Sequence, residues 1–221
     1  MNQWLSPAPG ITPYDPRVVA IAQRLKAGAR DRIELARRLF EFVRDQIAYS
    51  VQVPFWAIEH YTPAATLSRG AGYCVQKAAL LCSLARAVLI PARLGFADII
   101  NHQLPEYMLA VTGGKEIYYH CFVEWDLGEG WVKATPALDS ALCARHGWKV
   151  VEFVPGQDLM LPATTLSGQP HVEYIRYRGH RPGVPLAEML TAWREMDTKG
   201  VMKTWRAVAE QGWEAAGGED A

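Results

Sequence analysis

The chain has 221 residues, of which 50% are hydrophobic and 21% are charged, the composition of a soluble globular protein. Lys plus Arg and Asp plus Glu number 23 each, so no net charge concentrates nucleic acid or an anionic membrane at the surface. The basic residues Arg176, Arg178 and Arg181 stand without a recognised nucleic-acid-binding motif. We therefore expect a single domain over residues 1–221 with no nucleic-acid partner.

The N-terminal residues and the cysteines predict the location of the protein. The first residues, M-N-Q-W-L-S-P-A-P-G, lack a basic stretch followed by an apolar run. No uncharged apolar stretch approaches the roughly 20 residues that span a bilayer. The four cysteines form no C-x-x-C pair. We expect a cytoplasmic protein with free thiols and no membrane partner.

Two helices are predicted before residue 48. Asp15 and Pro16 are an N-cap and a first helical residue, and apolar residues recur at helical spacing until Gly28. Asp31 can cap a second helix, whose apolar stripe ends at Ile47.

A long segment then leads into a third helix. Residues 49–72 are rich in Pro, Gly and aromatic residues, which favours an irregular backbone, and loops of this length are usually functional. Residues 74–89 are apolar nearly all round, as in a helix enclosed by other elements, and Pro91 ends it.

Beyond Pro91 the sequence predicts mostly strands, followed by helices. The strands are expected over 93–100, 116–127, 131–134, 150–154 and 171–177, and the helices over 136–145, 186–196 and 201–215. The sequence L-G-E-G at 127–130 predicts a hairpin turn, and the last residues, G-G-E-D-A, a frayed tail. This order predicts an α+β domain whose helices lie on one side of an antiparallel sheet.

Cys74 is the candidate nucleophile. A thiol must lose its proton to react, and a free cysteine titrates near about 8.5, so a reactive cysteine needs help from its surroundings. Gly70 and Gly72 permit a tight turn before Cys74, and the N-terminal amides of the following helix favour a thiolate and can hold an oxyanion. Cys82, Cys121 and Cys143 lack this arrangement, and we expect them to be buried and unreactive.

His120 is the candidate base. It lies within the strongly β sequence I-Y-Y-H-C-F-V-E-W, and a strand holds an imidazole in one direction. The other histidines lie in loops or at element ends, namely His60, His102, His146, His171 and His180.

These residues resemble the bacterial type of the transglutaminase-like superfamily. The stretch R-G-A-G-Y-C-V-Q-K-A-A-L-L-C-S-L-A-R-A-V-L-I-P-A-R-L is similar to its cysteine helix and the strand that follows, and H-C-F-V-E-W-D-L-G-E-G-W-V-K-A-T-P is similar to its histidine strand. The core motif covers about residues 37–140, with the C-terminal helices 186–215 packed on it. The resemblance implies a papain-like fold and a Cys-His-Asp type of site for acyl transfer to water or an amine.

The third member of the site departs from the family pattern. Where the family commonly has Asp before Pro, this chain has Thr135, which can form a hydrogen bond but carries no charge. Asp139 is the first substitute and is predicted as a catalytic residue, although it is equally suited to cap a helix. Glu124, on the same face of the strand as His120, is the other acidic candidate. Trp56 or Gln52 is a candidate second oxyanion donor beside the amide of Cys74.

The sequence therefore predicts a cysteine-dependent peptidase or amidase, with transamidation as a further possible outcome. A thiolate–imidazolium pair of Cys74 and His120 would attack amide bonds of a protein or peptide substrate. The alternative is an inactive transglutaminase-like binding or structural module, which Thr135 favours. A single pair, Cys143 and His146, is too few for a structural zinc site, and no calcium loop is present, so we expect no metal and no cofactor.

Overall fold

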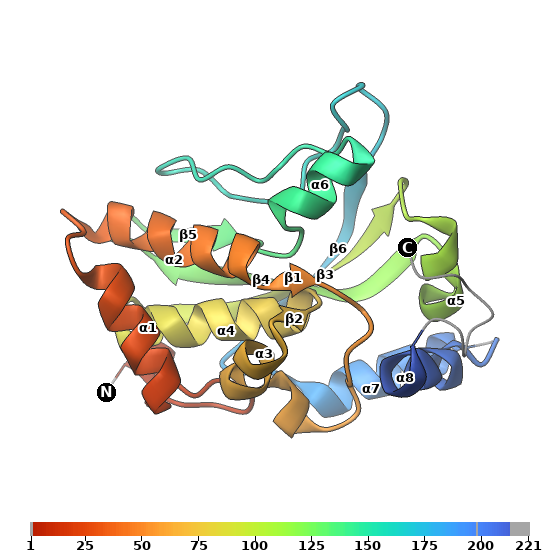
Figure 1. Ribbon diagram of the computed structural model, residues 1–221, viewed down its shortest axis with the longest axis horizontal. Coiled ribbons are helices and arrows are strands. Elements are labelled where there is room, and N and C mark those ends of the chain that lie inside the picture. The colour runs from red at the N-terminus through yellow and green to blue at the C-terminus, as the bar shows by residue number, and fades with distance from the viewer. Residues whose placement is uncertain (1, 198, 213–221) are drawn as a thin grey trace.

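The structure is a computed structural model that describes residues 2–197 and 199–212. Helices pack against a four-stranded antiparallel sheet, so the α+β prediction is confirmed (Figure 1). The helices are α1 (Pro16–Lys26), α2 (Arg32–Gln46), α3 (Pro63–Arg69), α4 (Cys74–Ala87), α5 (Leu109–Thr112), α6 (Ser140–His146), α7 (Leu186–Met196) and α8 (Val201–Gln211). The strands are β1 (Ala48–Tyr49), β2 (Ala71–Gly72), β3 (Ala92–Asn101), β4 (Glu116–Asp126), β5 (Trp131–Ala134) and β6 (Val172–Arg181), with short 3-10 turns at Gln3–Leu5, Ile58–Tyr61 and Glu106–Met108.

The main sheet has the strand order β5-β4-β3-β6. Each neighbouring pair is antiparallel, and Ala97 of β3 lies opposite His120 of β4. A separate parallel pair joins β1 to β2, with Tyr49 opposite Gly72. In Figure 1, α1 and α2 lie at the left, α5, α7 and α8 gather at the right, and α6 stands above the sheet. None of the helices in the described residues is both long and apolar enough to cross a membrane.

Helix α4 forms the centre of the core. Every residue from Cys74 to Arg86 is buried, and the helix contacts β3 and β4 on one side and α1, α2 and α3 on others. This is the enclosed helix that the sequence predicts.

The polar side chains of α4 hold the surrounding chain in place. Lys77 is fully buried, and its Nζ donates to the carbonyl oxygens of Arg44 and Ile47, at 2.9 and 2.5 Å, where α2 ends. Arg86 donates to the carbonyl oxygens of Ala92 and Pro182, so a second segment is tied to the helix. Burial lowers the pKa of Lys77 to about 7, because the charged form loses its hydration.

Gln76 and Ser83 add two further ties. Gln76 Nε2 donates to the carbonyl oxygens of Pro54 and His60 at 2.9 and 3.1 Å, and its Oε1 accepts from the backbone N–H of Tyr73 at 3.3 Å. Ser83 Oγ accepts from the backbone N–H of Thr12. Buried polar groups need such partners, and here the partners are mostly main-chain atoms of segments that surround α4.

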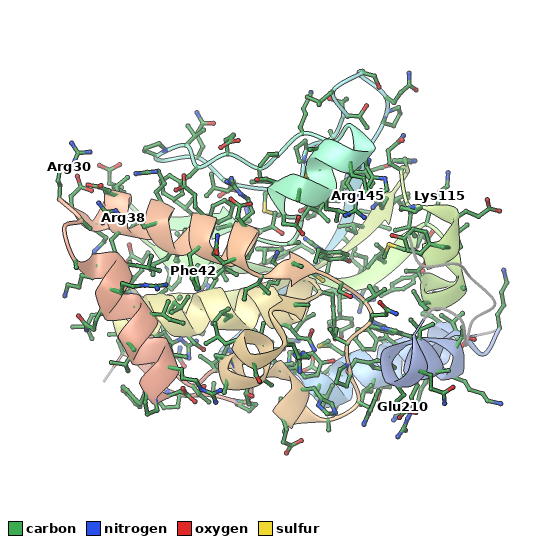
Figure 2. All side chains as sticks on the ribbon, viewed as in Figure 1. Arg30, Arg38, Phe42, Lys115, Arg145 and Glu210 are labelled. Carbon is green, nitrogen blue, oxygen red and sulfur yellow. The ribbon has the colours of Figure 1, made fainter. Side chains whose placement is uncertain are left out.

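The predicted helix caps are confirmed. Asp15 caps α1, and Asp31 caps α2 by accepting from the backbone N–H of Glu34 at 2.8 Å. Asp139 caps α6 by accepting from the N–H of Leu142, also at 2.8 Å. The ion pairs of Glu34 with Arg30 and Arg38 stand at the corner between α1 and α2, far from α8 (Figure 2).

Two predicted segments differ from the structure. Residues 49–72 are not wholly irregular, because Thr62 and Pro63 begin α3, with the Thr62 side chain accepting from the N–H of Ala65. Residues 150–154 do not form a strand, because this segment runs alongside α2, where Arg44 Nη1 binds the carbonyl oxygen of Val151 at 2.7 Å. The predicted end of the last helix, 213–215, and the tail lie outside the described residues.

Gly95 of β3 offers a test of the sheet packing. A Cβ at this position would lie 2.3 Å from the ring of Phe122, which faces it across the strands. Gly95→Ala should therefore lower the free energy of unfolding by about 1–3 kcal/mol through overpacking. Gly114→Ala is the matched control, since nothing lies within 4 Å of a Cβ there. Urea unfolding of both variants measures the effect, and equal stabilities would contradict this packing.

Candidate active site

Cys74 is the first residue of α4, directly after the N-cap Tyr73. The turn before it is held by the β1–β2 pair, in which the backbone N–H of Ser50 donates to the carbonyl oxygen of Gly72 at 3.2 Å. A Cβ at Gly72 would lie 3.0 Å from Gln76 Cβ, so a small residue suits the close approach of this turn to α4. The glycine-containing turn therefore delivers Cys74 to the helix N-terminus, as the sequence predicts.

Two opposing effects act on the Cys74 thiol. The side chain is 6% exposed, and this burial raises its pKa to about 11. Backbone hydrogen bonds from Cys121, Val75 and Cys74 itself lower the pKa, and burial exceeds them. Two of these amides belong to the first turn of α4, where backbone N–H groups have no partner within the helix.

His120 lies at a distortion of β4. The preceding residue, Tyr119, has a positive φ of 60°, and its N–H donates to Asp98 Oδ1 at 3.2 Å. The register of β3 also shifts between Ala97 and Ile99, opposite this point. Left-handed backbone at a residue other than glycine costs free energy, and such strain concentrates at functional sites. His120 therefore directly follows a strained residue in the middle of the sheet.

Two side chains bind the ring of His120 in the described residues. Thr135 Oγ1 lies 3.3 Å from Nε2, and the hydroxyl of Tyr174 lies 3.5 Å from the same nitrogen. The ring is 3% exposed, and burial alone lowers its pKa to about 4. No neighbouring carboxylate of the described chain raises this pKa, because both partners are neutral hydroxyl groups.

The backbone connects the two candidate residues. The backbone N–H of Cys121, in the peptide bond that joins it to His120, is one of the groups that lower the pKa of Cys74, and α4 packs directly against β4. The site residues from α4 and β4 are therefore neighbours in the fold. Both pKa shifts favour the uncharged forms, so burial opposes the thiolate–imidazolium pair that the sequence suggests for the free protein.

The acidic candidates are bound elsewhere. Asp139 Oδ2 accepts from the backbone N–H of Tyr49 at 2.8 Å, and its Oδ1 caps α6. Glu124 pairs with Arg93 at 2.6 Å and accepts from the hydroxyl of Tyr177 at 2.7 Å. Of the three candidates for the orienting role, Thr135 is the one that contacts His120 in the described structure.

The two residues considered as second oxyanion donors do not line the space beside Cys74. Trp56 packs edge-on against Phe55 and His60, with Arg206 above its ring at 4.5 Å. Gln52 follows β1 and points toward the end of α8, with its Nε2 3.4 Å from a Cβ placed at Gly212. Their positions in this structure support packing roles.

A cavity of about 510 Å³ opens beside Cys74. Its walls are mainly apolar and come from β1 and the loop after it, the end of β3, the turn at Glu106–Met108, α5, β4, α7 and α8. They include Tyr49, Val51, Ile100, Met108, Val111, Trp193, Met202 and Trp205. Trp205 fixes α8 against this site, because its ring stacks on Phe55 at 3.9 Å and its Nε1 donates to the carbonyl oxygen of Val51 at 2.8 Å. A cavity of this size with apolar walls can hold a small organic group beside Cys74.

Two tyrosines at the site, Tyr174 and Tyr49, are not predicted from the sequence. Tyr174 lies in β6, more than fifty positions from His120, and nothing in its local sequence connects the two residues. Tyr49 begins the segment that the sequence predicts to be irregular, and in the structure it lies in β1 and lines the cavity. In the described residues, no group of three or more His, Cys, Asp or Glu side chains is arranged to hold a metal ion.

Comparison with known proteins identifies the family. The core model of the Transglutaminase-like superfamily matches residues 19–136, which include α2, α4, β3, β4 and β5. No curated protein matches the chain significantly.

Two solved structures resemble this chain. One is a candidate cysteine protease from Cytophaga hutchinsonii, with a TM-score of 0.50 and 14% identity over 81% of this chain and 46% of that one. The other is the periplasmic domain of TgpA from Pseudomonas aeruginosa bound to ethylmercury, with a TM-score of 0.39 and 22% identity over 61% of this chain and 48% of that one. The chain thus spans about half the length of each. Because the family match covers more than half of its residues, the chain belongs to the Transglutaminase-like superfamily.

Proposed function

We propose that this protein hydrolyses amide bonds of a protein or peptide substrate through a cysteine nucleophile, with Cys74 as the nucleophile and His120 as the base. The observation that carries the proposal is the place of Cys74 at the N-terminus of α4 and on the wall of the cavity, in a helix that packs against the strand of His120. Membership of a family built around cysteine catalysis supports it.

The chemistry begins with a proton transfer. The bonds at Nε2 of His120 leave Nδ1 as the nitrogen that takes the thiol proton while sulfur adds to the carbonyl carbon. The carbonyl electron pair moves to oxygen, and His120 then gives its proton to the leaving amine as the C–N bond breaks. Water attacks the resulting thioester, which releases a carboxylic acid and restores the thiol.

The resting site in this mechanism is uncharged. Burial separates the pKa of Cys74, about 11, from that of His120, about 4, in the direction that keeps the proton on sulfur. Thr135 replaces the usual carboxylate and orients the ring without stabilising imidazolium. The ion pair therefore forms during attack on a bound substrate rather than before it.

Hydrolysis is preferred to transamidation as the outcome. The likeness in fold to a candidate cysteine protease supports a hydrolytic reaction.

The four cysteines are free and buried, which suits a reducing compartment and supports a cytoplasmic location.

An inactive binding module is the second candidate. The neutral Thr135 in place of a carboxylate and the raised pKa of Cys74 favour it, because both work against a reactive thiolate. The two functions differ in whether Cys74 accepts an acyl group.

Acyl transfer to Cys74 can be measured with 4-nitrophenyl acetate. The wild type should release 4-nitrophenolate and gain an acetyl group on the Cys74 peptide, and Cys74→Ala should abolish both because the nucleophile is gone. Cys143→Ala is the control, since this buried thiol of α6 does not line the cavity, and it should acylate like the wild type. Undiminished acylation of Cys74→Ala would falsify the nucleophile assignment, and an unreactive wild type would support the binding module. Cleavage of a casein digest by wild type alone extends the test to amides.

The charge state of the free thiol has its own pH signature. Iodoacetamide reacts with thiolate, so the alkylation rate of Cys74 should keep rising above pH 9 toward its pKa of about 11. The Cys74 peptide, quantified by mass spectrometry at each pH, gives the rate, and urea-unfolded protein gives the ordinary thiol profile. A rate that is already maximal at neutral pH would show a resting thiolate and contradict the uncharged site.

The side chain at position 135 should control the orientation and the pKa of the His120 ring. Thr135→Val keeps the shape but removes the hydroxyl, and we expect acylation to slow about tenfold, the effect of one hydrogen bond. Thr135→Asp places a carboxylate beside Nε2, which stabilises imidazolium and raises the pKa of His120 from about 4. Since the base must be neutral, the acid limb of the pH–rate profile should move to higher pH. An acid limb that stays in place in Thr135→Asp would contradict the contact.

A further inference from the structure

Four tyrosines belong to the surroundings of Cys74. Tyr49 and Tyr73 line the cavity together with Cys74, Tyr61 binds Tyr73, and Tyr174 lies beside His120. A charge on the Cys74 sulfur raises the pKa of all four phenols. A phenol is a strong hydrogen-bond donor, and its use depends on whether its hydroxyl already has a partner.

Three of these hydroxyl groups are already engaged. Tyr61 and Tyr73 bind each other at 2.6 Å, and Tyr61 also lies 2.7 Å from the carbonyl oxygen of Phe55. Tyr174 lies beside Nε2 of His120 and accepts from the backbone N–H of Leu161. These contacts occupy the hydroxyl groups of Tyr61, Tyr73 and Tyr174, so the three tyrosines support the structure of the site.

Tyr49 differs from the other three. Its ring is half-buried and lines the cavity together with Cys74. Within residues 2–197 and 199–212, its hydroxyl makes no hydrogen bond. A phenol without a partner, beside a nucleophile and on the wall of a cavity, is available to a bound molecule.

The backbone of Tyr49 is held by two contacts of its own and by a third just before it, at Ile47. It pairs in register with Gly72 of β2, two positions before Cys74. Its N–H donates to Asp139, and the carbonyl oxygen of Ile47 accepts from the buried Lys77. A donor on such a fixed strand needs little reorganisation when charge develops nearby.

We propose that the hydroxyl of Tyr49 is the second oxyanion donor of the site. This inference rests on the proposed acyl transfer and names a catalytic group for it. When sulfur bonds to the carbonyl carbon, the carbonyl electron pair moves onto oxygen, and the Tyr49 O–H and the backbone N–H of Cys74 donate to this oxygen. When the carbonyl re-forms and the leaving group departs, the phenol keeps its proton.

The chemistry of the phenol suits this role. Burial and the nearby thiol hold the pKa of Tyr49 above its ordinary value, so the hydroxyl stays protonated over the working range of pH. It acts as a donor and does not compete with His120 for the thiol proton.

Comparison of two reactions of the same sulfur tests the proposal. Acylation by 4-nitrophenyl acetate passes through an oxyanion, whereas alkylation by iodoacetamide is a displacement at a saturated carbon that creates none. Tyr49→Phe should lower the acylation rate about 10²-fold and leave the alkylation rate unchanged. The ring remains, so packing is preserved, and thermal unfolding checks the fold.

Tyr177→Phe is the matched control. It also removes one phenolic hydroxyl, but Tyr177 is 53% exposed on β6 and outside the cavity. Both of its rates should equal those of the wild type.

Each other outcome is decisive. Equal acylation by Tyr49→Phe and wild type overturns the donor role while the proposed function stands. A parallel fall in acylation and alkylation assigns Tyr49 to the shape of the site and also overturns it. A wild type that is alkylated at Cys74 but never acylated contradicts the proposed function, and the donor role falls with it.

Discussion

The fold depends on a helix that is buried on every side. Helix α4 excludes water along almost its whole length, so each polar side chain it carries must find a partner in protein. Lys77, Gln76 and Arg86 find theirs mainly in backbone carbonyl groups, which belong to the end of α2, the loop after β1 and the start of β3. The same contacts that make burial possible thus fix the segments that surround Cys74.

This arrangement explains what local sequence could and could not predict. The helix from Cys74 and the strand around His120 follow from hydrophobic pattern, because each is long and its neighbours are apolar. The partner of His120 could not be predicted. Thr135 and Asp139 lie only four positions apart in the sequence, and the path of the chain in the fold decides that Thr135 is the one that contacts the ring. Helix α3 could not be predicted either, because it has only seven residues and the prolines and glycines around it equally suit a loop.

Asp139 supports the site by binding backbone groups and not by binding His120. One of its oxygens caps α6 and the other holds the backbone of Tyr49, so both lone-pair sets bind main-chain N–H groups. The carboxylate of Asp139 therefore joins α6 to β1 beside the site. The imidazole of His120 is left among hydroxyl groups and apolar side chains, an environment that keeps it neutral.

Two parts of the chain form the cavity. Cys74 and the strands beneath it lie within the part that matches the superfamily, whereas Trp193, Met202 and Trp205 come from helices beyond residue 136. The reactive atoms are therefore encoded within the matched part, whereas the cavity wall is encoded partly there and partly in the C-terminal helices. Substitutions in α7 and α8 can therefore change which molecules fit the cavity while leaving in place the helix that carries Cys74 and the strand that carries His120.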